Sequence, residues 1–163
     1  MHKLVHIRRR KFMINGSRVN YYEVVEPDIV TIIPILDDGR IVIEKQYRPV
    51  IGKYIYEVPA GHVSSGETPM RAAARELEEE TGYRAKSLKL VLRTYHSVGS
   101  SRTVNNYFIA KGLYQGNPRP DAHEVIRVKK MSLSEAMEKL GGKGIHDTKT
   151  TMALLLLTQK RLI

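Results

Sequence analysis

The sequence contains no cysteine and no tryptophan, and its aromatic residues are nine tyrosines and two phenylalanines. Without cysteine there is no disulfide framework, thiolate zinc site, iron–sulfur cluster or cysteine nucleophile. The composition also fits a reducing compartment. No apolar run approaches the roughly 18 residues that a membrane-spanning helix needs. We therefore expect a soluble protein that does not enter a membrane.

Positive charge is in excess. The chain has 27 lysines and arginines against 17 acidic residues, which gives a formal net charge of +10. Such a charge favours anionic partners, namely nucleic acid, nucleotides or an acidic membrane surface, but does not choose among them. The basic amino-terminal stretch, MHKLVHIRRRKFMI, is not followed by the apolar segment of a signal peptide. We therefore expect a cytoplasmic location.

The length of 163 residues, with 42% hydrophobic residues and no internal repeat or long linker, predicts a single compact unit. Two dipeptides, Asn15-Gly16 and Asp38-Gly39, lie between runs rich in Val, Ile and Tyr, which is typical of tight hairpin turns. We expect one hairpin to pair 3–13 with 18–25 and another to pair 28–36 with 40–47. Further strands are expected at 54–58, 87–96, 103–111 and 124–131.

Three helices have recognisable ends. The first is expected over about 69–81, because Thr68 can cap it, Pro69 suits its first position and Gly82 suits a left-handed exit. The second follows a capping box of Ser132 and Glu135 and should stop at Gly141-Gly142, and the third follows Asp147. Strands before, between and around these helices predict an α/β fold with a mixed sheet flanked by helices.

The first helix carries three carboxylates on one side. At about 100° per residue, Glu76, Glu79 and Glu80 share a face while Glu78 points away. Like charges at this spacing destabilise a helix by roughly 0.2–0.5 kcal/mol per pair, and the macrodipole disfavours acids in the last turns by roughly 0.3–1 kcal/mol each. A hard divalent cation such as Mg²⁺ or Mn²⁺ would offset this repulsion. The alternative is a solvated helix end.

The spacing within residues 61–83 resembles the Nudix box. A glycine is followed after five residues by a glutamate, and after seven more by Arg-Glu-Leu-x-Glu-Glu-x-Gly and a bulky apolar residue. The residues that carry the resemblance are Gly61, Glu67, Arg75, Glu76, Leu77, Glu79, Glu80, Gly82 and Tyr83. Segments 41–67 and 132–156 are in addition similar to the ADP-ribose pyrophosphatase branch of that family.

The resemblance implies a Nudix-type α/β/α sandwich with a mixed sheet. It also implies a hydrolase that uses two or more Mg²⁺ or Mn²⁺ ions to cleave ADP-ribose or a related ADP-sugar into AMP and a sugar phosphate. Residues 1–25 would form a β extension through which the enzyme makes a homodimer, and 26–163 would form the Nudix hydrolase domain.

Roles for individual residues follow from the same resemblance. Metal ligands would be the main-chain carbonyl of Ala60 and the carboxylates of Glu76, Glu79, Glu80 and Glu124. The catalytic set would be Glu67, Arg75, Glu79 and Glu124, with Arg75 pairing with Glu67 or Glu79 to keep a carboxylate aimed. Which carboxylate acts as the base stays open.

Substrate contacts implied by the resemblance come from Arg48, Glu57 and Gly99. Arg48 could instead form an ion pair at a strand edge, and Glu57 could be a solvated strand residue. Gly61 would permit a close approach between a strand and a loop.

Two other functions remain open on the sequence. Within the same chemistry, the substrate could be another nucleoside diphosphate derivative or a dinucleoside polyphosphate. In a different class, the chain could be a Nudix-like module that binds nucleotide or RNA without turnover. The basic residues are scattered and no RNP, KH or helix-turn-helix signature is present, so a small nucleotide-sugar is the expected partner rather than nucleic acid.

Overall fold

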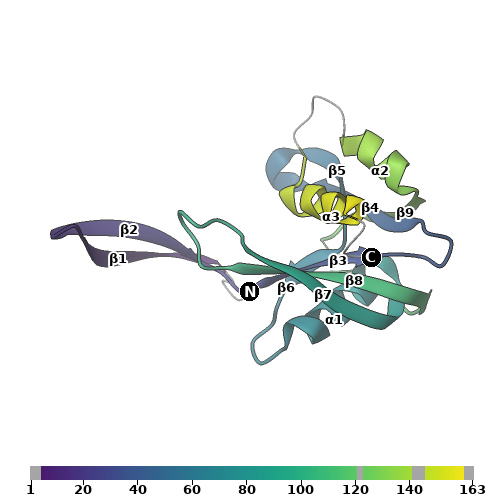
Figure 1. Ribbon diagram of the computed structural model, residues 1–163, viewed down its shortest axis with the longest axis horizontal. Helices are drawn as coiled ribbons and strands as arrows, with labels where there is room; N and C mark the ends of the chain where they lie inside the picture. Colours follow the sequence, from purple (N-terminus) through teal and green to yellow (C-terminus); the bar gives the residue numbers. More distant parts are fainter. Residues whose placement is uncertain (1–4, 121–122, 141–145, 160–163) are drawn as a thin grey trace.

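The computed structural model describes residues 5–120, 123–140 and 146–159, and contains two sheets in its body and a separate amino-terminal hairpin (Figure 1). The larger sheet is mixed, with the order β6-β3-β8-β7 and with β3 parallel to β8. Its strands are β3 (Ile29–Pro34), β6 (Ala60–His62), β7 (Tyr83–Tyr95) and β8 (Val104–Gln115). The smaller sheet is antiparallel, with the order β5-β4-β9. Its strands are β4 (Ile41–Arg48), β5 (Lys53–Glu57) and β9 (Ile126–Met131).

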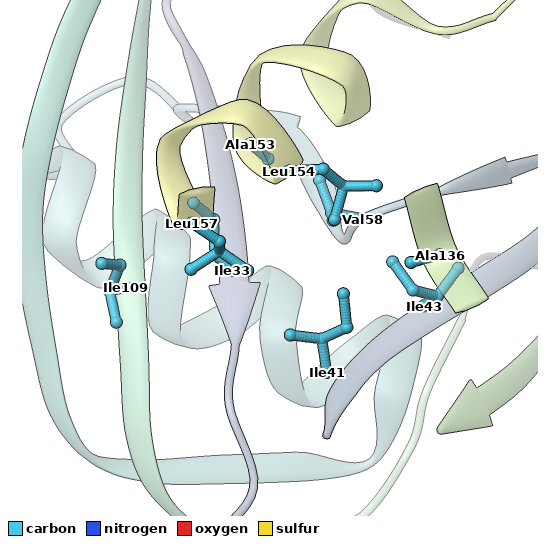
Figure 2. Close-up of a cluster of buried hydrophobic side chains, with 9 residues drawn as sticks. All are labelled: Ile33, Ile41, Ile43, Val58, Ile109, Ala136, Ala153, Leu154 and Leu157. Carbon is cyan, nitrogen blue, oxygen red and sulfur yellow. The ribbon is translucent and has the colours of Figure 1, made fainter. Parts of the chain in front are cut away.

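Helices pack on both sides of the mixed sheet, as the sequence predicts. α1 (Pro69–Thr81) lies against one face and buries Leu77 beside Ile32. α3 (Thr148–Thr158) lies on the other side and contacts both β3 and β5, while α2 (Leu133–Leu140) contacts α3 and β9. Because successive strand residues face opposite sides, Ile33 points away from α1. It joins a second core cluster under α3, shown in Figure 2, with Ile41, Ile43, Val58, Ile109, Ala136, Ala153, Leu154 and Leu157.

The helix ends follow the predicted capping residues. Thr68 accepts a hydrogen bond from the main-chain N–H of Arg71, and α1 ends at Gly82 with φ of 73°. Ser132 and Glu135 form the expected capping box before α2, and Asp147 caps α3 by accepting from the Thr150 N–H. The predicted stop of α2 at 141–142 lies outside the described residues. No helix in the described part of the chain is long and apolar enough to cross a membrane.

The second predicted hairpin is wrong, although its turn is present. Gly39 has φ of 82°, and a single bridge joins Ile35 to Ile41. Beyond the bridge the two strands separate into different sheets. The physical reason is that all six residues of β3 are buried, and both of its edges already pair, with β6 on one side and β8 on the other. β6 occupies its edge only at Ile29–Thr31, which leaves β4 no continuous edge to follow, and β4 pairs with β5 and β9 instead. The short strand β6 was not predicted.

The amino-terminal hairpin forms as predicted. β1 (His6–Ile14) and β2 (Ser17–Val25) pair in register around the turn at Asn15-Gly16, where both residues have positive φ. Figure 1 shows the hairpin extending away from the body of the molecule. It touches the body near the loop after β7, where the Val24 N–H donates to the carbonyl of Ser100 at 2.7 Å. Several large apolar side chains on it are exposed, including Ile7, Met13 and Tyr22.

Candidate active site

A pocket of about 500 Å³ is lined by residues from both sheets, from α1 and from the start of α3. The strands and helices that contribute to it are far apart in sequence, and the fold brings them together. Six of the residues predicted for the site line this pocket: Arg48, Ala60, Arg75, Glu76, Glu80 and Glu124.

The acidic face of α1 is held close to β6. The main-chain N–H of Ala60 donates to Oε2 of Glu80 at 2.9 Å, which fixes this carboxylate at the strand edge. Gly61 makes room for the neighbouring acid, because a Cβ at this position would lie 2.1 Å from Oε1 of Glu76. Contacts under 3.0 Å are not tolerated, so a side chain here would displace the carboxylate of Glu76. The close approach at Gly61 is thus between β6 and a side chain of α1, whereas the sequence predicted one between a strand and a loop.

Arg75 connects several of the acids. Its guanidinium donates to Glu67 through Nε at 3.1 Å and Nη2 at 3.0 Å, and through Nη1 to Glu76 at 2.7 Å and Glu79 at 2.9 Å. Nη2 also donates to the main-chain carbonyl of His62 at 3.0 Å. The hydrogen bonds from Arg75 lower the pKa of Glu67. Arg75 thus pairs with both predicted partners and fixes their orientation relative to β6.

Two carboxylates that line the pocket, Glu76 and Glu80, and a third behind the lining, Glu44, are poorly solvated. Burial raises the pKa of Glu80 well above its ordinary value, and the nearby charges of Glu44 and Glu76 add to the effect. Burial also raises the pKa of Glu76, although Arg75 opposes the shift. Glu44 on β4 is 1% exposed, and burial together with the charge of Glu57 raises its pKa to about 8. Ionising all three acids would therefore require more positive charge than the neighbouring cations supply.

The pocket lining also carries cations. Arg48, at the end of β4, donates to Glu57 through Nε at 2.7 Å and Nη2 at 2.8 Å. Glu57 is 1% exposed and does not line the pocket itself. Lys149, in the first turn of α3, lines the pocket with its Nζ 3.7 Å from Oε2 of Glu57 and 2.6 Å from Oδ1 of Asp147. One buried carboxylate therefore lies between two cations.

The remaining predicted residues lie outside the pocket lining. Glu67 and Glu79 are connected to the pocket by their hydrogen bonds to Arg75, which does line it, and the Glu79 side chain is 38% exposed. Gly99 lines a different hollow, between the loop after β7 and the amino-terminal hairpin. Glu78 points away, as predicted, and accepts hydrogen bonds from Arg84 and from the Asn117 N–H.

Sequence reasoning missed Glu44, Lys149, His62 and His96. Glu44 interrupts the apolar run Ile41–Ile43 on a central strand, and an acid in such a run is a usable signal of a buried polar site. Lys149 follows the capping residue of a helix, where a cation is electrostatically disfavoured, which is a second usable signal. The two histidines line the pocket, but nothing in their sequence context points to it.

The donor chemistry of the pocket fits a hard divalent cation. Buried carboxylates and a main-chain carbonyl, that of Ala60, are the oxygen ligands that Mg²⁺ and Mn²⁺ prefer. Oε1 of Glu44 is buried without a hydrogen-bond partner among the described residues, which marks uncompensated acidity next to Glu80. Within the described ranges, no three acidic or histidine side chains alone form a metal-binding group. Mg²⁺ commonly keeps waters and takes substrate phosphates as further ligands.

Comparison with known proteins agrees with the geometry. Residues 26–152 match the NUDIX domain. The chain is 33% identical over 148 residues to the ADP-ribose pyrophosphatase of Bacillus subtilis (strain 168), covering 90% of this chain and 80% of the relative. It is 34% identical over 142 residues to the methanol dehydrogenase activator of Bacillus methanolicus, covering 86% and 77% of the two chains. A crystal structure of an ADP compounds hydrolase superposes with a TM-score of 0.83 at 24% identity, covering 98% and 87%.

Three observations agree. The mixed sheet lies between helices, an acid-bearing helix packs on a glycine-containing strand, and the NUDIX domain match covers most of the chain. The chain belongs to the Nudix family of hydrolases. The structural neighbour confirms the predicted Nudix fold.

Proposed function

We propose that the protein hydrolyses the diphosphate bond of ADP-ribose or a related ADP-sugar, giving AMP and a sugar phosphate. The observation that carries the proposal is the pocket, which places Glu76, Glu80 and Glu124 together with Arg48 and Lys149. A diphosphate linked to a nucleoside needs both metal-binding acids and phosphate-binding cations. The ADP-ribose pyrophosphatase activity in the name of the Bacillus subtilis relative supports this substrate class.

The chemistry follows from charge. A diphosphate repels an incoming hydroxide, and Mg²⁺ or Mn²⁺ held by Glu76, Glu80, Glu124 and the Ala60 carbonyl would supply phosphate neutralisation and a more acidic water. Arg48, held by Glu57, would bind a phosphate oxygen, and Arg75 keeps Glu67 and Glu79 aimed. The oxygen of water bonds to one phosphorus as the bridging P–O bond breaks, and a carboxylate accepts the proton.

The accepting carboxylate is Glu79 or Glu124, and two matched variants separate them. Glu79→Gln and Glu124→Gln each remove one proton acceptor while keeping the side-chain volume. In the variant that lacks the base, the kcat–pH profile should lose its acidic limb. In the other variant, the profile should keep its shape while kcat is lower. Profiles with unchanged shape in both variants would show that neither residue is the base.

The assembly, location and metal complete the proposal. Residues 1–25 form the β extension of a homodimer and 26–163 form the hydrolase domain, which the exposed apolar side chains of the projecting hairpin support. The enzyme is cytoplasmic and uses two or more Mg²⁺ ions, with Mn²⁺ as an alternative.

A substrate panel tests the proposal. The protein is incubated with Mg²⁺ and ADP-ribose, other ADP-sugars, dinucleoside polyphosphates or nucleoside triphosphates, and the products are separated. The expected result is AMP and ribose 5-phosphate from ADP-ribose, with the highest kcat/KM of the panel. Consumption of nucleoside triphosphates alone would contradict the proposal, and binding without any turnover would favour a non-catalytic module.

A further inference from the structure

Lys149 occupies an electrostatically unfavourable position for a helix. It is the second residue of α3, directly after Thr148 and the N-cap Asp147. A cation in the first turn opposes the macrodipole. Helix stability therefore does not explain the lysine. The acids of α1 likewise oppose the macrodipole at their helix end, and both sets of charges face the same pocket.

The ammonium group of Lys149 is held in place but retains donor capacity. Its hydrogen bond to Oδ1 of Asp147, at 2.6 Å, uses one of three N–H donors. The 3.7 Å separation from Glu57 is too long to use a second. The side chain is 18% exposed, and the residue lines the pocket. Nζ is thus positioned by two carboxylates while it faces a space that a ligand can enter.

Glu57 couples Lys149 to Arg48. Its two oxygens accept from the Arg48 guanidinium, and Oε2 also faces Nζ of Lys149. Because Glu57 is buried, its position is fixed by the sheet, and the two cations are held on the same side of the pocket. The acids Glu76 and Glu80 lie on the α1 side. A diphosphate carries negative oxygens on both phosphorus atoms, so it can face the metal-binding acids with one set and the cations with the other.

We propose that Lys149 is a substrate-binding residue that donates a hydrogen bond to a nonbridging oxygen of the substrate's diphosphate, with Asp147 and Glu57 positioning its ammonium group. The inference rests on the proposed function. It differs from a purely structural role, in which Lys149 would only pair with Asp147 at the N-cap of its own helix and with Glu57 of β5.

The test compares Lys149→Met with Lys149→Gln, which keeps a donor for Asp147 but removes the charge. Steady-state rates with ADP-ribose and Mg²⁺ should show KM raised about tenfold or more in both variants, with kcat changed by less than about threefold. The dissociation constant of α,β-methylene-ADP, which resists hydrolysis, should rise by a similar factor in calorimetric titration. Lys89→Met, at an exposed position on β7, is the matched control and should leave both values unchanged.

The outcomes separate the inference from the proposed function. If wild type hydrolyses ADP-ribose and both variants keep its KM while losing thermal stability, Lys149 is structural and the inference is wrong. If the wild-type protein does not hydrolyse ADP-ribose, the proposed function fails. The affinity of the variants for α,β-methylene-ADP then decides alone whether Lys149 binds a diphosphate. Should Lys149→Met fail to fold, Lys149→Gln carries the same comparison.

Discussion

At the scale of single residues, the acidic site depends on the absence of a side chain at position 61 and on a buried carboxyl group at position 44. Gly61 lacks the side chain that would collide with Glu76. Glu44 places a carboxyl group on a strand whose preceding residues, Ile41 to Ile43, belong to the apolar core. The Nudix resemblance predicted the role of Gly61, because the box specifies a glycine at this position. It says nothing of Glu44, whose signal in the sequence is instead an acid that directly follows the apolar run Ile41–Ile43.

Gly61→Ala should lower activity strongly without unfolding the protein. The added methyl group displaces the Glu76 carboxylate, and a misplacement of about 1 Å costs on the order of 100-fold in rate. We expect kcat/KM for ADP-ribose to fall by about that factor. Gly116→Ala is the control, because its Cβ would press on Glu78, on the side of α1 away from the pocket. A Gly61→Ala enzyme with wild-type kcat/KM would contradict the assigned role of Glu76.

Glu44 should make the metal-free protein less stable as the pH rises. Burial raises its pKa from 4.5 in the unfolded chain to about 8 in the folded protein. Between these values the folded protein holds a proton that the unfolded chain has released, so the free energy of unfolding falls with rising pH. The full effect is at most about 5 kcal/mol.

The check is urea unfolding of wild type and Glu44→Gln in EDTA, at several pH values from 5 to 8. Glu44→Gln should reduce the decline in stability, leaving the part due to the raised pKa values of Glu76 and Glu80. An equal decline in both proteins would show that Glu44 does not hold the extra proton.

At the scale of elements, local signals predicted helix ends and failed for strand pairing. Thr68 and Asp147 cap α1 and α3 as expected, because a cap is decided by a few neighbouring residues. The pairing of 28–36 with 40–47 was wrong, because it is decided by which strands occupy the edges of β3. The same limit applies to the site: the α1 acids were found from their helical spacing, whereas Lys149 reaches the pocket only through the docking of α3.

Asp147→Ala should affect both stability and substrate binding. Loss of the cap of α3 should lower the free energy of unfolding by about 0.5–2 kcal/mol, and loss of the Lys149 partner should raise KM. Ser132→Ala removes the corresponding cap of α2, away from the pocket, and should lower stability alone. Urea unfolding and steady-state kinetics on the two variants make the comparison. Equal KM values would contradict a positioning role for Asp147.

At the scale of the whole molecule, the amino-terminal hairpin lacks a covering partner within the described chain. Ile7, Met13 and Tyr22 are 72%, 64% and 64% exposed, and the strand register places all three on one face of the hairpin. An isolated two-stranded hairpin is marginally stable in water. A second copy of the chain would cover this face, in agreement with the proposed homodimer.

Ile7→Glu should therefore shift the protein from dimer toward monomer. A charge on this face opposes burial of the apolar side chains around it. Light scattering coupled to size-exclusion chromatography measures the mass of each species. Val50→Glu, at a fully exposed position outside the hairpin, is the control and should leave the mass unchanged. A wild-type monomer, or a dimer unaffected by Ile7→Glu, would contradict this assembly.

The most direct test of the account is the Mg²⁺-dependent rate of AMP formation from ADP-ribose by wild type, Glu80→Gln and Glu78→Gln. Glu80 points into the pocket, whereas Glu78, two residues earlier on the same helix, pairs with Arg84 outside it. We predict that Glu80→Gln reduces kcat by at least about 100-fold at saturating Mg²⁺ while it remains folded, and that Glu78→Gln retains wild-type kcat. Equal rates for Glu80→Gln and wild type would show that the acidic face of α1 does not hold the catalytic metal.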